Sequence, residues 1–102
     1  MSAYNVVRFR VKAGREKEFI EANKTMTGSG EMKGFRKGAL IKTGDRTYCF
    51  IGEWKDMAAI VAARPAMIGG LDSMRGMLED LGGGLGVTDP VSGEAVFESS
   101  TG

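Results

Sequence analysis

The chain has 102 residues, of which 42% are hydrophobic and 26% are charged, and its 14 basic and 13 acidic residues leave a net charge of +1. This composition suits one soluble domain, taken as residues 1–102 with a core over about 4–98, and the interspersed charges favour neither a nucleic acid nor a membrane surface as partner. The absence of histidine argues against a zinc site and against a protein-derived His ligand to haem iron.

Nothing in the sequence predicts export or membrane insertion. The first ten residues, MSAYNVVRFR, lack the apolar core of a secretory signal, and no run approaches the ~18 apolar residues of a membrane span. The single cysteine, Cys49, cannot form an intrachain disulfide. We therefore expect a cytoplasmic protein.

The first third of the chain predicts a strand, a helix and a flexible loop. Residues 4–11 alternate, which places Asn5, Val7, Phe9 and Val11 on one face of a half-buried strand. Residues 15–26 have the helical spacing of an amphipathic segment, with Phe19, Asn23 and Met26 on one stripe. The glycine-rich stretch 27–34 predicts a loop.

A hairpin follows, with strands over 35–43 and 46–54 around a Gly44-Asp45 turn. This turn predicts that Ile41 faces Tyr48, Ala39 faces Phe50 and Leu40 faces Cys49. Opposed residues share a face of the sheet. Ile41, Tyr48, Phe50 and Trp54 should then lie on the same side as Val7 and Phe9.

The last part of the chain predicts helical segments and a final strand. Asp56 is a suitable N-cap for a helix over 57–64, which Pro65 should break or kink and Gly69-Gly70 should interrupt. Asp72 should restart a helix that runs to about residue 81. Residues 67–81 would carry a buried stripe of Met67, Leu71, Met74, Leu78 and Leu81. A mobile connection over 81–93 would lead to a strand at 94–99.

The order βαββαβ predicts an α+β, ferredoxin-like fold, with a four-stranded antiparallel sheet and two helices on one face. The other face would remain apolar at Val6, Leu40, Cys49, Ile51 and Val96, beside charged Arg8, Arg10 and Glu53. Because large exposed apolar surfaces usually mark association sites, we expect a homodimer that packs sheet against sheet. A half-solvated sheet in a monomer is the alternative.

Two segments of the chain resemble the antibiotic biosynthesis monooxygenase (ABM) family of the dimeric α/β-barrel superfamily. These are VVRFRVKAGREKEF near the start and GEWKD at the end of the third strand. The resemblance extends over about 4–98 and implies a dimeric α/β barrel. One branch of the family oxidises anthrone- or quinol-type aromatics with O2 and without flavin or metal, and another degrades haem.

The resemblance to the haem branch is incomplete. That branch pairs a pocket tryptophan, matched here by Trp54, with an asparagine of the first strand and an iron-ligating histidine of the second helix. The asparagine position aligns with Val7, with Asn5 one pleat away, and the histidine is missing. We therefore expect no cofactor and no metal.

The resemblance to the cofactor-free branch implies a dry aromatic pocket on the helix-facing side of the sheet. Trp54 would stack on a flat substrate, and Asn5 and Tyr48 would hydrogen-bond its oxygens, which makes these three the candidate catalytic residues. The candidate substrate-binding residues are Val7, Phe9, Phe50, Met67 and Met74. The residue types do not identify a base.

Two functions remain open from the sequence. The chain could be a cofactor-independent monooxygenase acting on a small aromatic compound, or a non-catalytic, dimeric binding protein for a small hydrophobic ligand. Trp54 and Tyr48 could also be ordinary core residues.

Overall fold

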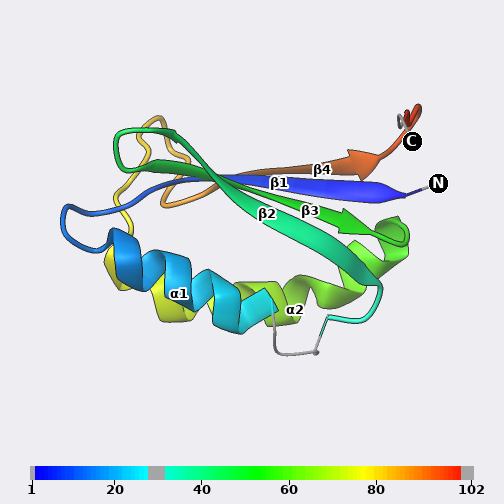
Figure 1. Cartoon of the computed structure of the whole chain (residues 1–102), viewed down its shortest axis with the longest axis horizontal. Helices are drawn as coiled ribbons and strands as arrows, with labels where there is room; N and C mark the ends of the chain where they lie inside the picture. The colour runs from blue at the N-terminus through cyan, green and yellow to red at the C-terminus, as the bar shows by residue number, and fades with distance from the viewer. Residues whose placement is uncertain (1, 28–31, 100–102) are drawn as a thin grey trace.

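The computed structural model describes residues 2–27 and 32–99, and its strands and helices follow the order βαββαβ. The elements are β1 (Ala3–Arg10), α1 (Glu16–Thr27), β2 (Phe35–Gly44), β3 (Thr47–Trp54), α2 (Met57–Met74), the 3₁₀ turn η1 (Arg75–Met77) and β4 (Asp89–Glu94). The strands form one antiparallel sheet in the order β2-β3-β1-β4, and both helices lie against the same face (Figure 1). The predicted ferredoxin-like fold is confirmed.

The central strands β1 and β3 have the predicted faces. Asn5 and Phe9 of β1, and Phe50 and Trp54 of β3, are buried on the side of the helices. The strands pair so that Val7 lies opposite Phe50 and Phe9 opposite Tyr48. The predicted stripe of α1 also holds, because Phe19 is fully buried and Asn23 is 4% exposed.

The predicted register of the hairpin is wrong by one residue. Leu40, rather than Ala39, lies opposite Phe50, and Ile41 lies opposite Cys49. The turn is formed by Asp45 and Arg46, and an irregularity between Lys42 and Gly44 takes up the extra residue. A shift of one residue moves every side chain of a strand to the other face.

Ile41 and Leu40 therefore exchange the faces expected for them. Leu40 packs with the main core cluster, whereas Ile41 is 42% exposed on the helix-free face. Burying Leu40 against Phe50 is a tertiary interaction, which a turn signal alone does not encode.

The sequence predicted that a helix over 57–64 would break or kink at Pro65. It does not break there, because α2 runs through Pro65 and the two following glycines. Pro65 is exposed, and its neighbour one turn back, Val61, is 51% exposed, so water can reach the carbonyl that loses its hydrogen bond. At Gly70 a β-carbon would collide with the sulfur of Met26, so glycine here lets α1 and α2 approach closely.

The second helix also ends earlier than predicted. After η1, Leu78 forms an isolated bridge with Val11, and the Glu79 amide donates to the Arg10 carbonyl at 2.8 Å. Leu78 is buried as predicted, but through this extended pairing and not through a helical turn. Extension of β1 therefore competes successfully with helix propagation.

The final strand lies five residues before its predicted position. β4 is Asp89–Glu94, whereas Val96 and Phe97 lie outside the sheet and are 94% and 77% exposed. Pro90 is tolerated because β4 is an edge strand that pairs with β1 alone. The expectation that Val96 contributes to the helix-free face is therefore wrong.

The helix-free face of the sheet carries an apolar row that crosses all four strands. The register aligns Val91, Val6, Ile51 and Ala39 in that order. Polar neighbours flank this row, including the Arg8–Asp89 ion pair at 3.2 Å. Within the described residues, no helix combines the length and hydrophobicity that crossing a bilayer would require.

Candidate functional site

A second row of residues, on the helix-facing side of the sheet, is made of small side chains. The register aligns Gly38, Gly52, Asn5 and Ser92 across the four strands. Rows of larger residues lie on both sides of it, because Phe35 pairs with Trp54 and Leu40 pairs with Phe50. The small row therefore leaves space between the sheet and the helices that the larger side chains do not fill.

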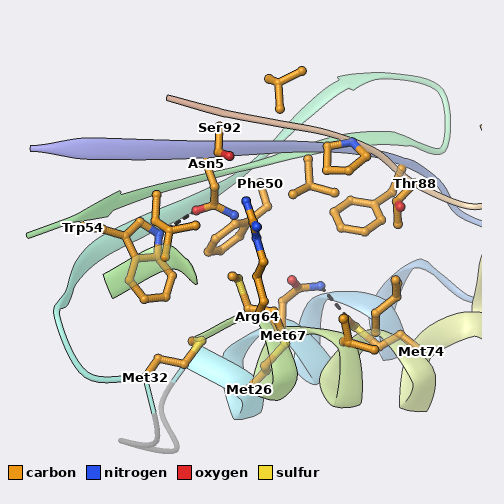
Figure 2. A pocket seen from close by; sticks show the side chains of 18 residues that line it. Asn5, Met26, Met32, Phe50, Trp54, Arg64, Met67, Met74, Thr88 and Ser92 are labelled. Atoms are coloured by element: carbon orange, nitrogen blue, oxygen red, sulfur yellow. Dashed lines mark hydrogen bonds between the residues drawn. The ribbon is translucent and has the colours of Figure 1, made fainter. Parts of the chain in front are cut away.

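This space is a cavity of about 460 Å³, within the usual range for small-molecule sites (Figure 2). The strands contribute Asn5, Val7, Phe9, Phe50 and Trp54 to its wall. The buried core is divided into two clusters, one around Phe9 and Phe50 and one around Trp54. Since members of both clusters line the cavity, the cavity lies between them.

The helices and β4 form the other sides of the cavity. α2 contributes Ile60, Arg64, Met67, Ile68, Leu71 and Met74, and α1 contributes Asn23 and Met26. Thr88, Pro90 and Ser92 line the side formed by β4 and the segment before it. Thioether side chains adapt to ligands of irregular shape, so this wall can adjust to a bound molecule.

Trp54 and Asn5 form a hydrogen-bonded pair in the wall. The indole Nε1 of Trp54 donates to Oδ1 of Asn5 at 2.7 Å, and the two residues are 1% and 7% exposed (Figure 2). Trp54 also packs edge-on against Phe35, with ring centroids 5.0 Å apart. It is therefore a core residue and a cavity residue at once.

Gly52 makes this pair possible. A β-carbon at Gly52 would collide with Oδ1 of Asn5 and would approach Nε1 of Trp54 to 3.0 Å and Cε2 of Phe50 to 3.2 Å. A glycine within a strand often marks such a close approach. The partner of Trp54 is thus Asn5 and not Val7, which lies opposite Phe50.

The cavity contains few polar groups. Arg64, Thr88, Ser92 and the amides Asn5 and Asn23 are the polar lining residues in the described part of the chain, and none of the described lining residues is acidic. Arginine remains protonated at all accessible pH values. The described wall therefore offers hydrogen-bond donors and a positive charge, but no side chain that would accept a proton at neutral pH.

Tyr48 does not line this cavity. It borders a separate space between α1 and β2, together with Ile20, Lys24 and Lys42. Its hydroxyl donates to Oε2 of Glu16 at 2.5 Å, and the same carboxylate oxygen accepts from Nζ of Lys42 at 3.1 Å. The hydrogen bond to Glu16, together with burial, raises the pKa of Tyr48, and that bond also lowers the pKa of Glu16.

The structure thus brings together most of the residues that the sequence suggested. Asn5 and Trp54 share the cavity with all five candidate substrate-binding residues, which are Val7, Phe9, Phe50, Met67 and Met74. Tyr48 stands apart from them. Sequence reasoning missed Gly52 and Arg64. The glycine between Phe50 and Trp54 was a usable signal, but Arg64 lacked one because its contacts depend on where α2 crosses the sheet.

Comparison with known proteins is consistent with this architecture. The sequence model described as "Antibiotic biosynthesis monooxygenase" matches residues 2–65. No curated protein sequence matches the chain. Several solved structures share the fold.

Three such structures illustrate the similarity. A variant of SnoaB, a cofactor-independent oxygenase from Streptomyces nogalater, is 20% identical over 95% of each chain, with a TM-score of 0.72. Rv0793 from Mycobacterium tuberculosis is 12% identical over 98% of this chain and 100% of its own, with a TM-score of 0.75. A conserved protein from Methanosarcina mazei is 14% identical over 90% of each chain, with a TM-score of 0.73. At these identities the likeness shows the fold alone.

Proposed function

The chain belongs to the antibiotic biosynthesis monooxygenase family, and from this premise we propose that it is a cofactor-independent oxygenase of a small, flat aromatic compound. The observation that carries the proposal is the hydrogen-bonded pair of Trp54 and Asn5 in the wall of a 460 Å³ apolar cavity. The resemblance of the fold to that of SnoaB, described as a cofactor-independent oxygenase, adds support.

The proposed reaction uses O2 as the oxidant and the substrate as the electron donor. An anthrone-type methylene loses a proton, and the resulting carbanion transfers one electron to O2. The two radicals combine through a new C–O bond, and protonation gives a hydroperoxide. Loss of water then leaves a carbonyl, so that one CH2 group and one O2 give one C=O group and one H2O.

The protein would contribute positioning and an apolar environment. Trp54 would stack on the rings, and Asn5 would hydrogen-bond the substrate oxygen on which negative charge accumulates. Val7, Phe9, Phe50, Met67 and Met74 would exclude water from the reacting carbon. The position of Tyr48, outside the cavity and bonded to Glu16, gives no support to a catalytic role for it.

One observation favours a second candidate, a binding protein without catalysis. A general base would be expected in an enzyme that removes a proton from carbon, and the described cavity wall supplies none. Haem degradation is not proposed, because the chain has no histidine and α2 presents Arg64 to the cavity instead.

Oxygen uptake separates the two candidates. The protein is incubated in air with a panel of anthrones and quinols, and O2 consumption is compared with that in buffer. Acceleration by the wild type, reduced at least about tenfold in Trp54→Phe and unchanged in the exposed control Phe97→Leu, supports the enzyme. Absence of acceleration across the panel, or full activity in Trp54→Phe, contradicts the oxygenase at this site.

We also propose that two copies assemble through the helix-free face of the sheet, as a dimeric α/β barrel. The apolar row of Val91, Val6, Ile51 and Ala39 crosses that face, and Ile41 extends the apolar surface. Burial of this row against a second copy would recover about 25 cal/mol per Å² of apolar surface.

A further inference from the structure

The amide of Asn5 has an orientation that its neighbour determines. An indole N–H can only donate, so the atom of Asn5 that faces Trp54 must be the oxygen. The –NH2 group therefore points to the other side. No hydrogen bond from Nδ2 is found within the described residues, and Asn5 is 7% exposed and lines the cavity.

Nδ2 of Asn5 opens onto the cavity without a protein acceptor among the described residues, and water in the cavity can reach it. Polar side-chain atoms in protein interiors are hydrogen-bonded to other protein atoms or to ordered water, so a ligand that displaces this water must offer an acceptor in its place. A ligand oxygen in the cavity would satisfy the Nδ2 donor of Asn5. The cavity wall is therefore prepared for an acceptor at this position.

Arg64 adds a positive charge to the same cavity. It lies on α2 one turn after the buried Ile60, and Figure 2 shows its side chain extending from the helix into the cavity, toward the sheet that carries Asn5. Within the described residues it forms no ion pair, and no acidic residue is among the described lining residues. The arginines around the exterior, by contrast, include Arg8 and Arg75, which pair with carboxylates.

Two donors, one of them cationic, and no carboxylate together favour a negatively charged acceptor. We propose that the cavity takes its aromatic ligand as an anion, with the charged oxygen held by the Arg64 guanidinium and by Nδ2 of Asn5 and the rings against Trp54. This inference names the substrate class of the proposed function and rests on it. The anionic oxygen is that of a carboxylate or of an ionised enol or phenol.

The inference also bears on the missing base. An enol or phenol that binds already ionised needs no proton acceptor in the wall. Charge-assisted hydrogen bonds contribute about 1.5–3 kcal/mol, which corresponds to about 10–100-fold in affinity. Because Arg64 is exposed, an effect at or below the lower end of this range is expected.

Calorimetric titration with matched probes tests the proposal. Naphthalene carboxylate is compared with the neutral naphthalene carboxamide, and lawsone, ionised at neutral pH, with its neutral methyl ether. The wild type should bind at least one anion about tenfold more tightly than its neutral partner, and the pair that shows the difference distinguishes carboxylate from enolate. Equal affinity within both pairs, or no binding of any probe, overturns the proposal.

Variants assign the preference to the two residues. Arg64→Gln should lose about tenfold in affinity for the anion and little for the neutral probe. Arg75→Gln removes the same charge from a residue outside the cavity and should change neither. Asn5→Asp keeps an oxygen to accept from Trp54 but replaces the donor by a charge, and it should abolish anion binding. Anion affinity that survives in Arg64→Gln, or falls equally in Arg75→Gln, overturns the assignment.

The binding titrations test the anion site whether or not the protein oxidises any substrate. If the protein prefers the anions through Arg64 but consumes no O2, the proposed anion site stands and the oxygenase proposal is wrong. If the protein oxidises neutral anthrones without preferring anions, the proposed anion site is wrong and the oxygenase proposal stands.

Discussion

At the scale of single residues, the site depends on the absence of a side chain at Gly52. Its missing side chain leaves room for the bond between Trp54 and Asn5, which forms the polar corner of the cavity. The stretch YCFIGEWKD could be recognised from sequence as a strand that ends in a tryptophan. That its glycine makes room for Asn5 could not be recognised, because Asn5, whose Oδ1 is the nearest atom that a side chain would meet, lies in β1, more than 40 positions earlier in the chain.

We predict that Gly52→Ala disrupts the site although it adds only one methyl group. The new methyl group would collide with Oδ1 of Asn5, so the bond to Trp54 must break or lengthen. We expect a loss of about 1–3 kcal/mol in the free energy of unfolding and altered Trp54 fluorescence. Chemical denaturation and emission spectra measure both. Gly69→Ala is the control, since no atom lies within 4 Å of the added methyl group there; equal behaviour of the two variants would contradict this account.

Tyr48 and Glu16 form a pair whose protonation can be followed directly. The raised pKa of Tyr48 means that the neutral hydroxyl contributes stability below the ordinary pKa of tyrosine, which is lost as pH rises through the raised value. The lowered pKa of Glu16 means that its carboxylate contributes stability above the ordinary pKa of glutamate, which is lost as pH falls through the lowered value.

We predict that Glu16→Gln lowers the pKa of Tyr48 toward its ordinary value, because the charge that opposes tyrosinate formation is removed. Tyrosinate absorbance against pH measures the change. Tyr4 is the internal reference, because its pKa is raised to about 12 by a hydrogen bond to Glu98, by burial and by Glu53, none of which the substitution affects. An unchanged titration of both tyrosines would show that Glu16 does not hold the Tyr48 hydroxyl in solution.

At the scale of elements, α2 shows which local signals are reliable. Asp56 caps the helix as its sequence position suggested, with Oδ1 accepting from the Ala59 amide at 2.8 Å. Pro65 did not end the helix, because an exposed proline on a long helix with a packed face leaves only one solvent-accessible carbonyl without its bond. Capping acts within a few residues, whereas helix continuation depends on packing against the sheet.

We predict that Asp56→Ala lowers the free energy of unfolding by about 1 kcal/mol, since the Ala59 amide loses its acceptor. Asp56→Ser restores an acceptor oxygen and should recover most of the loss. Urea denaturation followed by circular dichroism measures both variants. If serine were as destabilising as alanine, the carboxylate would act through something other than the cap.

At the scale of the whole molecule, the apolar row on the helix-free face leads to a prediction about assembly. Ile51 lies within that row, between Val6 and Ala39. Ile51→Lys should therefore convert the proposed dimer to a monomer, because a lysine would be buried without a partner. Sedimentation velocity measures the change, with Val61→Lys, at an exposed position of α2, as the control. A wild type that sediments as a monomer, or an Ile51→Lys variant that remains dimeric, contradicts this interface.

The sequence by itself determined the order of elements, the buried faces of β1, β3 and α1, the cap of α2 and the membership of Asn5 and Trp54 in one surface. These follow from side-chain periodicity and capping, which act over a few residues. Only the tertiary structure decided the register of β2, the position of β4 and the place of Arg64 in the cavity wall. β4 turns Pro90 and Ser92 toward an open cavity, so its sequence has no hydrophobic pattern to detect. Leu40 and Arg64 take their positions from the packing of elements that are distant in the sequence.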